Sequence, residues 1–175
     1  MVIYKELDLR GLYQAAVQSA ITTAQVMVLL AGASVFGWLL TVGQIPQDLT
    51  KLVIESNSSP VMFLIGINII LILAGMFIDG SSAIVILAPL VYPIALQLGI
   101  DPVHLGVIMV ANAAIGMFTP PFGLNLFVAA FTTGLPIIDI MKAVMPFVAI
   151  SILVLLLITY IPDVSLLLPK MVYGN

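Results

Sequence analysis

The sequence predicts an all-α integral membrane protein, and three observations support this fold class. Of its 175 residues, 62% are hydrophobic and only 7% are charged, whereas a soluble domain carries about 25% charged residues. Several apolar stretches have the length of a helix that spans a bilayer. One of them contains two consecutive prolines, Pro120 and Pro121, which predicts a broken helix of the kind that carries ion and substrate sites in secondary transporters.

The composition also excludes several kinds of chemistry. The chain has no cysteine, which rules out thiol catalysis, disulfides and thiolate metal sites. Its single histidine, His104, cannot by itself form a histidine metal cluster. There is no phosphate-binding glycine loop with its lysine, and no base is expected beside the hydroxyls of Ser81 and Ser82. The net charge of −3 is small and scattered. We therefore expect neither an enzyme nor a nucleic-acid-binding protein.

Five elements besides a hairpin follow from the apolar pattern. Residues 1–19 mix charged and apolar side chains, which is typical of a helix lying at the membrane interface. Residues 20–42 are apolar over the length of a span. Residues 46–58 predict an amphipathic helix and a polar loop. Further along, we expect a broken helix over residues 102–133 and a last span over residues 139–161, so that membrane lipids are partners of the chain.

Residues 60–98 predict a helical hairpin with a polar tip at residues 79–82. Asp79 precedes Ser81 and Ser82 at the start of the second arm, a typical position for a helix N-cap. If both arms cross the bilayer, the tip lies among the headgroups. In a re-entrant hairpin the tip lies in the membrane interior, where an acid is a functional hypothesis by default. Arm length does not decide between the two, and we expect the re-entrant form because the tip would face a second irregular segment.

The double proline predicts how the broken helix is built. Proline has no N–H, so Pro120 and Pro121 leave the carbonyls of Gly116 and Met117 without their helical donors. We expect one helix to stop near Gly116 and a second to resume after Gly123. A proline kink without a ligand is the alternative. The small and polar residues that flank the prolines favour a binding site.

Together, the tip and the break offer oxygen ligands for a small cation. They supply the hydroxyls of Ser81, Ser82 and Thr119 and several backbone carbonyls. Neutral oxygens with few charges suit Na⁺ better than a divalent metal, which requires more carboxylates. The helix N-termini that follow the tip and the prolines would direct partial positive charge to the same region, which suits an anionic substrate.

Three segments resemble the large membrane subunit of tripartite ATP-independent periplasmic (TRAP) transporters. They read TTAQVMVLLAGASVFGWLL, GMFIDGSSAIVILAPLVYPIALQLGIDPVHLG and VIMVANAAIGMFTPPFGLNLFVA, and GIDPVHLG and TPPFGLNLFV are their more specific parts. The similarity covers nearly the whole chain and is to the C-terminal half of that subunit. It implies one half of an inverted-repeat, elevator-type transporter, with a re-entrant helical hairpin and a proline-broken helix.

The resemblance also implies a function and a set of partners. The function is Na⁺-driven uptake of an organic acid, of dicarboxylate or sialic-acid type, by a multi-pass protein of the bacterial cytoplasmic membrane. The partners are the N-terminal half of the large subunit, a small membrane subunit and a periplasmic substrate-binding protein. Na⁺ is the coupling ion, and no cofactor is implied.

By motif, the resemblance matches Asp79, Gly80, Ser81 and Ser82 to the hairpin tip and Gly116, Thr119, Pro120 and Pro121 to the bridge of the broken helix. The other site residues are expected from the double proline and the small and polar residues around it. Na⁺ binding is expected, mostly through backbone carbonyls, from Asp79, Gly80, Ser81, Ser82, Gly116, Met117, Thr119 and Pro121. Substrate binding is expected from Asn112, Pro120, Gly123 and Asn125.

Three alternatives to a TRAP permease stay open at this point. One is a related ion-coupled anion carrier that works without a binding protein. The second is a non-transporting structural half-subunit or fragment. The third is an intramembrane hydrolase, which is the least supported because the tip serines lack a neighbouring base.

Overall fold

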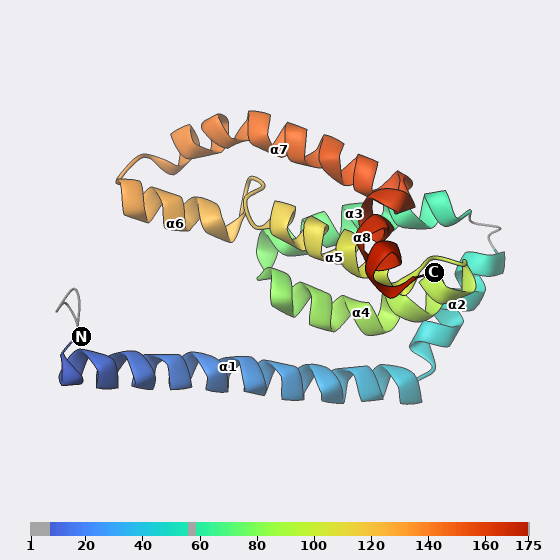
Figure 1. The fold of residues 1–175 in the computed structure, drawn as a ribbon, viewed down its shortest axis with the longest axis horizontal. Helices are drawn as coiled ribbons and strands as arrows, with labels where there is room; N and C mark the ends of the chain where they lie inside the picture. Colours follow the sequence, from blue (N-terminus) through green and yellow to red (C-terminus); the bar gives the residue numbers. More distant parts are fainter. Residues whose placement is uncertain (1–7, 56–58, 175) are drawn as a thin grey trace. The chain divides into compact units, whose positions relative to one another are not determined.

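The computed structural model describes residues 8–55 and 59–174, and every regular element within these ranges is an α-helix (Figure 1). The all-α class is therefore confirmed. The chain divides into two compact units, Met1–Leu39 and Leu40–Asn175. Each unit is described by itself below.

Helix α1 (Leu9–Val42) makes up nearly all of the described part of the first unit, and its residues from Leu40 onward belong to the second unit. Its N-terminus is capped by Asp8, whose carboxylate accepts a hydrogen bond of 2.6 Å from the Gly11 N–H. One helix runs through both the predicted interfacial helix ending at residue 19 and the predicted span beginning at residue 20, so the structure has no helix boundary there. No proline interrupts this stretch. Residues 1–7 of the predicted interfacial helix lie outside the described residues.

The second unit contains the remaining helices. They are α2 (Ile45–Glu55), α3 (Pro60–Phe77), α4 (Gly80–Gln97), α5 (Pro102–Gly116), α6 (Leu124–Thr133), α7 (Ile137–Tyr160) and α8 (Pro162–Tyr173). The sequence did not predict α8 as a helix. Lys170 near its end donates a 2.8 Å hydrogen bond to Asp163 in its first turn, and this bond and the ammonium charge hold the pKa of the Asp163 carboxyl below its usual value. Residues 56–58 of the predicted polar loop lie outside the described residues.

Capping residues fix the start of the helices that form the hairpin and the broken helix. Ser59 caps α3 by accepting a hydrogen bond from the Met62 N–H. Asp101 caps α5 in the same way, and Pro102 occupies the first turn where its missing N–H costs nothing. Gly99 has a φ of +74°, which glycine adopts without steric strain, and it lets the chain turn between α4 and α5.

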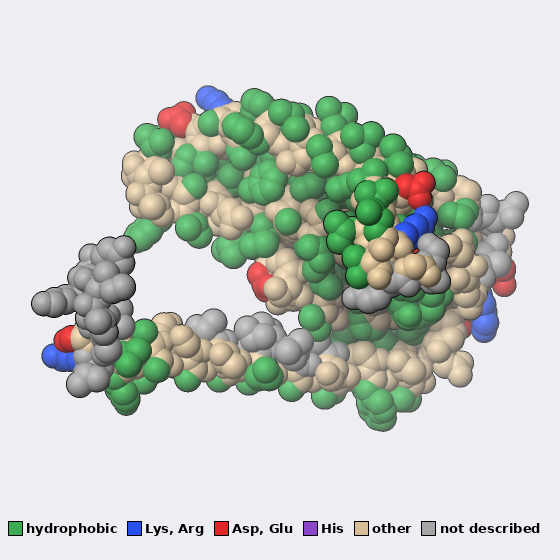
Figure 2. Space-filling view, viewed as in Figure 1, with side chains coloured by type: hydrophobic (Ala, Val, Ile, Leu, Met, Phe, Trp, Pro, Cys, Tyr) green, Lys and Arg blue, Asp and Glu red, His purple; other side chains and the backbone are tan. Residues whose placement is uncertain are grey.

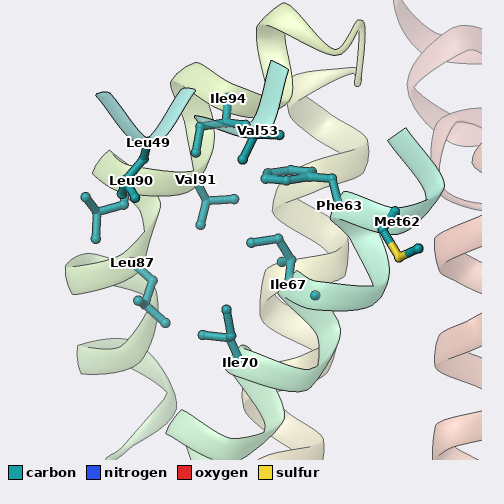
Figure 3. A pocket seen from close by; sticks show the side chains of 11 residues that line it. Leu49, Val53, Met62, Phe63, Ile67, Ile70, Leu87, Leu90, Val91 and Ile94 are labelled. Carbon is teal, nitrogen blue, oxygen red and sulfur yellow. The ribbon is translucent and has the colours of Figure 1, made fainter. Parts of the chain in front are cut away.

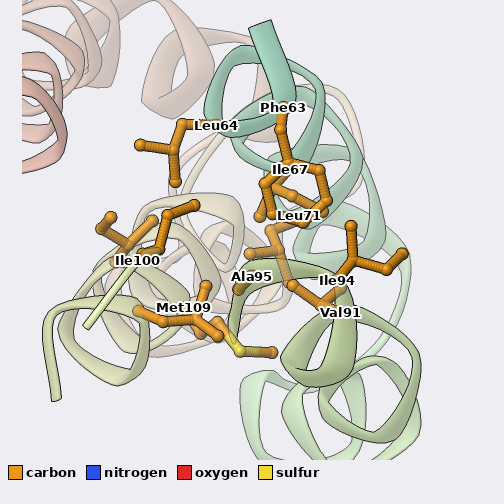
Figure 4. Close-up of a cluster of buried hydrophobic side chains, with 11 residues drawn as sticks. Phe63, Leu64, Ile67, Leu71, Val91, Ile94, Ala95, Ile100 and Met109 are labelled. Carbon is orange, nitrogen blue, oxygen red and sulfur yellow. The ribbon is translucent and has the colours of Figure 1, made fainter. Parts of the chain in front are cut away.

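Buried side chains of α3, α4 and α5 form the main core of the second unit (Figure 4). Helix α5 is central, since it packs against α3, α4, α7 and α8. Leu71 of α3 and Ile108 of α5 are completely buried. The core side chains are Phe63, Leu64, Ile67, Leu71, Val91, Ile94, Ala95, Ile100, Leu105, Ile108 and Met109.

The outer surface of the second unit is apolar. Hydrophobic side chains cover the exterior of α7, and charged groups occur only near its ends (Figure 2). Within the described residues, three helices are long and apolar enough to cross a membrane, namely α3, α4 and α7. Because such a surface is stable only in contact with lipid or protein, the chain is a membrane protein.

Candidate functional site

The tip of the hairpin is organised by one carboxylate. Asp79 lies between α3 and α4, and its Oδ1 accepts hydrogen bonds from the N–H groups of Ser81 and Ser82, at 3.0 and 3.1 Å. The Ser82 hydroxyl donates to Asp79 Oδ2. The predicted cap is therefore confirmed. Asp79 and Ser82 are half-buried and Ser81 is exposed, so the Ser81 side of the tip is open to its surroundings.

The broken helix is interrupted where the double proline predicts it. Helix α5 ends at Gly116 and α6 begins at Leu124. The peptide bond between Pro120 and Pro121 is cis. Gly123 lies at the N-cap of α6 without a side-chain cap.

The carbonyls freed by the prolines are not left unpaired, contrary to the sequence prediction. The Thr119 N–H donates to Gly116 O at 3.0 Å, and the Asn125 N–H donates to Met117 O at 2.9 Å. The physical reason is that the chain turns tightly, so the N–H groups of Thr119, just before the prolines, and Asn125, after them, replace the donors that the prolines lack. A carbonyl oxygen has two lone pairs, and each of these therefore keeps the capacity for one further contact.

The tip and the break lie against each other. A Cβ placed on Gly116 would lie 2.7 Å from the Cα of Gly75, near the end of the first hairpin arm. A Cβ on Gly80 would lie 3.3 Å from the sulfur of Met117. Two aromatic rings, Phe77 beside the tip and Phe122 in the break, stack with centroids 5.0 Å apart. Backbones can approach this closely only where glycine removes the side chain.

The predicted site residues fall into three environments. Gly80, Gly116, Met117, Thr119 and Gly123 are buried or half-buried, the first three where the tip meets the break and the other two within the break itself. Ser81, Pro121 and Asn125 are exposed, and Asp79, Ser82 and Pro120 are half-buried at the edge. Asn112 is completely buried one turn before the break, so the structure does not bring it to the same surface.

Asn112 belongs to a chain of buried polar side chains that crosses the helices. Its amide nitrogen donates to Asn68 Oδ1 of α3 at 2.7 Å and to Ile108 O at 2.8 Å. Asn68 in turn donates to Thr159 Oγ1 of α7 at 3.2 Å. Within the described part of the chain, Asn112 Oδ1 is a buried oxygen without a hydrogen-bond partner.

His104 extends this polar chain to the other end of α5. Its Nε2 lies 3.2 Å from the carbonyl oxygen of Thr159, which can only accept, so Nε2 carries a proton. Its Nδ1 lies 2.6 Å from the hydroxyl of Ser165 in α8. His104 is 3% exposed, and it therefore joins α5 to α7 and α8 from within the protein.

The sequence did not predict that Asn68, Thr159 and Ser165 form hydrogen bonds in this buried polar chain. A signal was present, since Asn68 stands alone among aliphatic residues in GINIILIL. A polar side chain inside an apolar membrane helix usually bonds to a neighbouring helix. The pairing itself needs the fold, because Asn68 and Thr159 are 91 residues apart.

The oxygens of the tip and the break fit a monovalent cation better than a divalent one. They comprise one carboxylate, three hydroxyls and carbonyls that already accept one hydrogen bond each. Among the residues with described placement, no three His, Cys, Asp or Glu side chains lie together. A divalent cation would need several such ligands.

These observations define the class of protein: an α-helical membrane protein in which a hairpin tip packs on a proline-broken helix. Residues 1–164 match the model of a family described as "Tripartite ATP-independent periplasmic transporter, DctM component". The chain belongs to this family.

Relatives with assigned names agree with the family match. The chain is 44% identical over 170 residues to the C4-dicarboxylate TRAP transporter large permease protein of Pseudomonas aeruginosa, a match covering 97% of this chain and 40% of the relative. It is 34% identical to the sialic acid TRAP transporter large permease protein of Vibrio cholerae, over 99% of this chain and 40% of the relative. It is 38% identical to the isethionate TRAP transporter permease protein of Oleidesulfovibrio alaskensis, over 94% and 26%. The chain thus spans about two-fifths or less of the length of these relatives.

Proposed function

We propose that this chain is part of a TRAP large permease subunit that takes up an organic acid across the bacterial cytoplasmic membrane. Membership of the family supports transport as the activity. The relatives named above are assigned to C4-dicarboxylates, sialic acid and isethionate. All three are organic anions, so an organic anion of dicarboxylate or sialic-acid type is the proposed substrate. The proposed partners are the rest of the large subunit, a small membrane subunit and a periplasmic binding protein.

We further propose that uptake is coupled to Na⁺ at the contact between the tip and the break. The observation that carries this proposal is the close packing of Gly75 and Gly80 against Gly116 and Met117. It supports a single site built from both segments, so that an ion bound there would hold the tip closed on the broken helix. The Thr119 hydroxyl is buried and donates to Ile115 O at 2.6 Å, which leaves its lone pairs for a cation.

The proposed substrate region adjoins this ion site at the start of α6. Gly123 provides no side-chain cap, so no side-chain oxygen offsets the partial positive charge at the N-terminus of α6, which would attract an anion. The same segment of the chain contains the exposed side chain of Asn125 and the half-buried Pro120. In an elevator-type carrier, the hairpin and the broken helix would move as one body.

The test compares two threonines that make the same type of hydrogen bond, one buried at the break (Thr119) and one exposed (Thr132). Thr119 at the break and Thr132 near the end of α6 each donate a hydroxyl hydrogen bond to the carbonyl four residues earlier, at 2.6 and 2.8 Å. The full-length permease, its small subunit and its binding protein would be reconstituted in vesicles, with uptake measured against Na⁺ concentration. Thr119→Val should raise the half-saturating Na⁺ concentration about tenfold, since one oxygen ligand is lost.

Thr132→Val is the control and should leave the Na⁺ dependence unchanged. Equal Na⁺ dependence in both variants, at normal folding and expression, would contradict the ion site. Uptake that needs no Na⁺ in the unmodified protein would contradict Na⁺ coupling while leaving organic-acid transport intact.

A further inference from the structure

We propose that His104 and Ser165 form a buried proton-binding site that holds α8 against α5 and α7 more tightly when a proton is bound. The site lies where these three helices pack together, near the N-terminal end of α5 and away from the break. His104 is buried and Ser165 is half-buried. The site is separate from the proposed Na⁺ site, and no step proposed above for transport uses it.

Both ring nitrogens of His104 lie against oxygen atoms. Nε2 is 3.2 Å from the carbonyl oxygen of Thr159, which only accepts hydrogen bonds, so Nε2 carries a proton whether the ring is neutral or charged. Nδ1 is 2.6 Å from Ser165 Oγ, and a hydroxyl both donates and accepts. Nδ1 is therefore the atom at which this ring gains or loses a proton.

The hydroxyl of Ser165 has two acceptors for its single proton. One is Nδ1 of His104, and the other is the carbonyl oxygen of Pro162, 2.9 Å from Oγ. With a neutral ring, the hydroxyl donates to Nδ1. When a proton from water forms an N–H bond at Nδ1, the hydroxyl turns to Pro162 O and its oxygen accepts the new N–H. The ring charge changes from 0 to +1, and every N–H and O–H of the cluster has an acceptor in both states.

No carboxylate pairs with the His104 ring among the residues that the structure describes. Asp163 and Lys170 of α8 bond to each other at 2.8 Å, and Asp101 accepts the backbone N–H groups of Val103 and His104. Helix α3 carries no titratable side chain. On α5, at its N-cap and on the other helices packed against it, the titratable side chains of described placement besides His104 are Tyr92, Asp101, Asp139, Lys142, Tyr160, Asp163 and Lys170.

Hydrogen-bonded oxygens therefore have to offset the cost of burying the charge. Thr159 lies in the last turn of α7, where the helix dipole favours a positive charge. The N-terminus of α5 has the opposite effect, and the capping carboxylate of Asp101 reduces it. A hydrogen bond from a charged N–H is stronger than the neutral bond that it replaces. The contact of α8 with α5 is therefore stronger in the protonated state.

The test compares Ser165→Ala with the unmodified full-length permease by denaturant titration at about pH 5.5 and about pH 8, near the two ends of the range in which histidine usually titrates. Alanine offers no acceptor for the Nδ1 proton. The factor by which Ser165→Ala raises the unfolding equilibrium constant should be about tenfold larger at the lower pH, the difference between a charged and a neutral hydrogen bond. Other titrating groups cancel, because the two proteins are compared at the same pH.

Val91→Ala is the control for destabilisation without a titratable contact. Val91 is buried and lines a groove of about 310 Å³ between α2, α3 and α4 that has only hydrophobic side chains and one glycine (Figure 3). Val91→Ala should therefore raise the unfolding constant by the same factor at both pH values. Ser165→Thr keeps the hydroxyl and should behave as the unmodified protein does. In a His104→Gln background, Ser165→Ala should lose its pH dependence.

A second measurement keeps the test decisive if Ser165→Ala does not fold. Deuterium exchange at the ring carbon between the two nitrogens depends on the protonation state of a histidine, and mass spectrometry of the peptide that contains His104 reports it for this ring alone. In the folded, unmodified permease, the exchange rate should rise and level off between about pH 5 and 8. An exchange rate without this step would overturn the proposal. So would equal destabilisation by Ser165→Ala at the two pH values, which would leave Ser165 with a structural hydrogen bond alone.

Discussion

The two ends of helix α5 hold their neighbours in different ways. At its C-terminal end, the contact with the hairpin is made by backbone against backbone at Gly75 and Gly116. From Asn112, one turn before that end, to His104 in the first turn, the contacts with α3, α7 and α8 are made by side chains. The contact at Gly116 depends on the absence of side chains, whereas the contacts of Asn112 and His104 depend on side-chain hydrogen bonds.

We interpret this difference as one between the proposed ion site and a fixed contact between helices. Hydrogen bonds between buried polar side chains in an apolar environment fix the register of the helices. A glycine contact has no such directional bonds, so two surfaces can separate without leaving polar groups unpaired. A hairpin tip that admits an ion must be able to separate from the broken helix. The four predictions below test this contrast, from the largest expected effect to the smallest.

Gly116→Ala should have the largest effect on stability. The added Cβ would lie 2.7 Å from Gly75 Cα and 2.8 Å from Ile72 O, and neither backbone atom can move independently. We expect a loss of about 3 kcal/mol in the free energy of unfolding, the upper range for overpacking. Denaturant titration of the purified full-length permease would measure it. Gly106→Ala is the control, with no atom within 4 Å of the new Cβ, and should be neutral or stabilising. Similar losses in both would show that the close contact is not the cause.

Asn68→Leu should have the next largest effect. It removes the bonds to Asn112 and Thr159 and leaves their polar groups buried, at a cost of about 1–2 kcal/mol. Combining it with Asn112→Leu removes both members of the central pair, so the double variant should be less destabilised than the sum of the single ones. The double-mutant cycle, followed by the same titration, measures this coupling. If the two losses of unfolding free energy were strictly additive, Asn68 and Asn112 would not be energetically coupled.

Asp79→Ala separates capping from ion binding by comparison with Asp101→Ala. Each aspartate accepts two backbone N–H bonds at a helix start, α4 for Asp79 and α5 for Asp101. We expect each substitution to lower stability by about 1 kcal/mol. Only Asp79→Ala should also raise the Na⁺ concentration needed for half-maximal uptake. An equal Na⁺ requirement in the two variants would leave Asp79 with a capping role alone.

Phe122→Ala should have the smallest effect. Its ring packs on Phe77 with centroids 5.0 Å apart, but it is half exposed, so about 0.5–1 kcal/mol should be lost. Phe131→Ala is the control because that ring is 93% exposed. A melting-temperature series in detergent would compare the two. No difference between them would mean that the aromatic pair does not hold the tip against the break.

The sequence by itself determined the membrane class and the places where helices start and stop. Apolar length predicted α3, α4 and α7, and local chemistry predicted the cap at Asp79 and the break before Gly123. These features depend on residues within a few positions of one another. Apolar length did not reveal that α1 runs unbroken through residue 20, because polar and apolar segments join smoothly when no proline or cap separates them.

Only the tertiary structure decided which groups meet. The freed carbonyls of Gly116 and Met117 found new donors because the chain turns tightly through the break, which brings the N–H groups of Thr119 and Asn125 to them. Asn112, which the sequence placed among the substrate residues, turned inward to Asn68, 44 residues away. Gly75 gained its role from a contact with Gly116 on another helix. Local sequence sets backbone propensity, but a long-range contact depends on how whole helices pack, and packing is a property of all their side chains together.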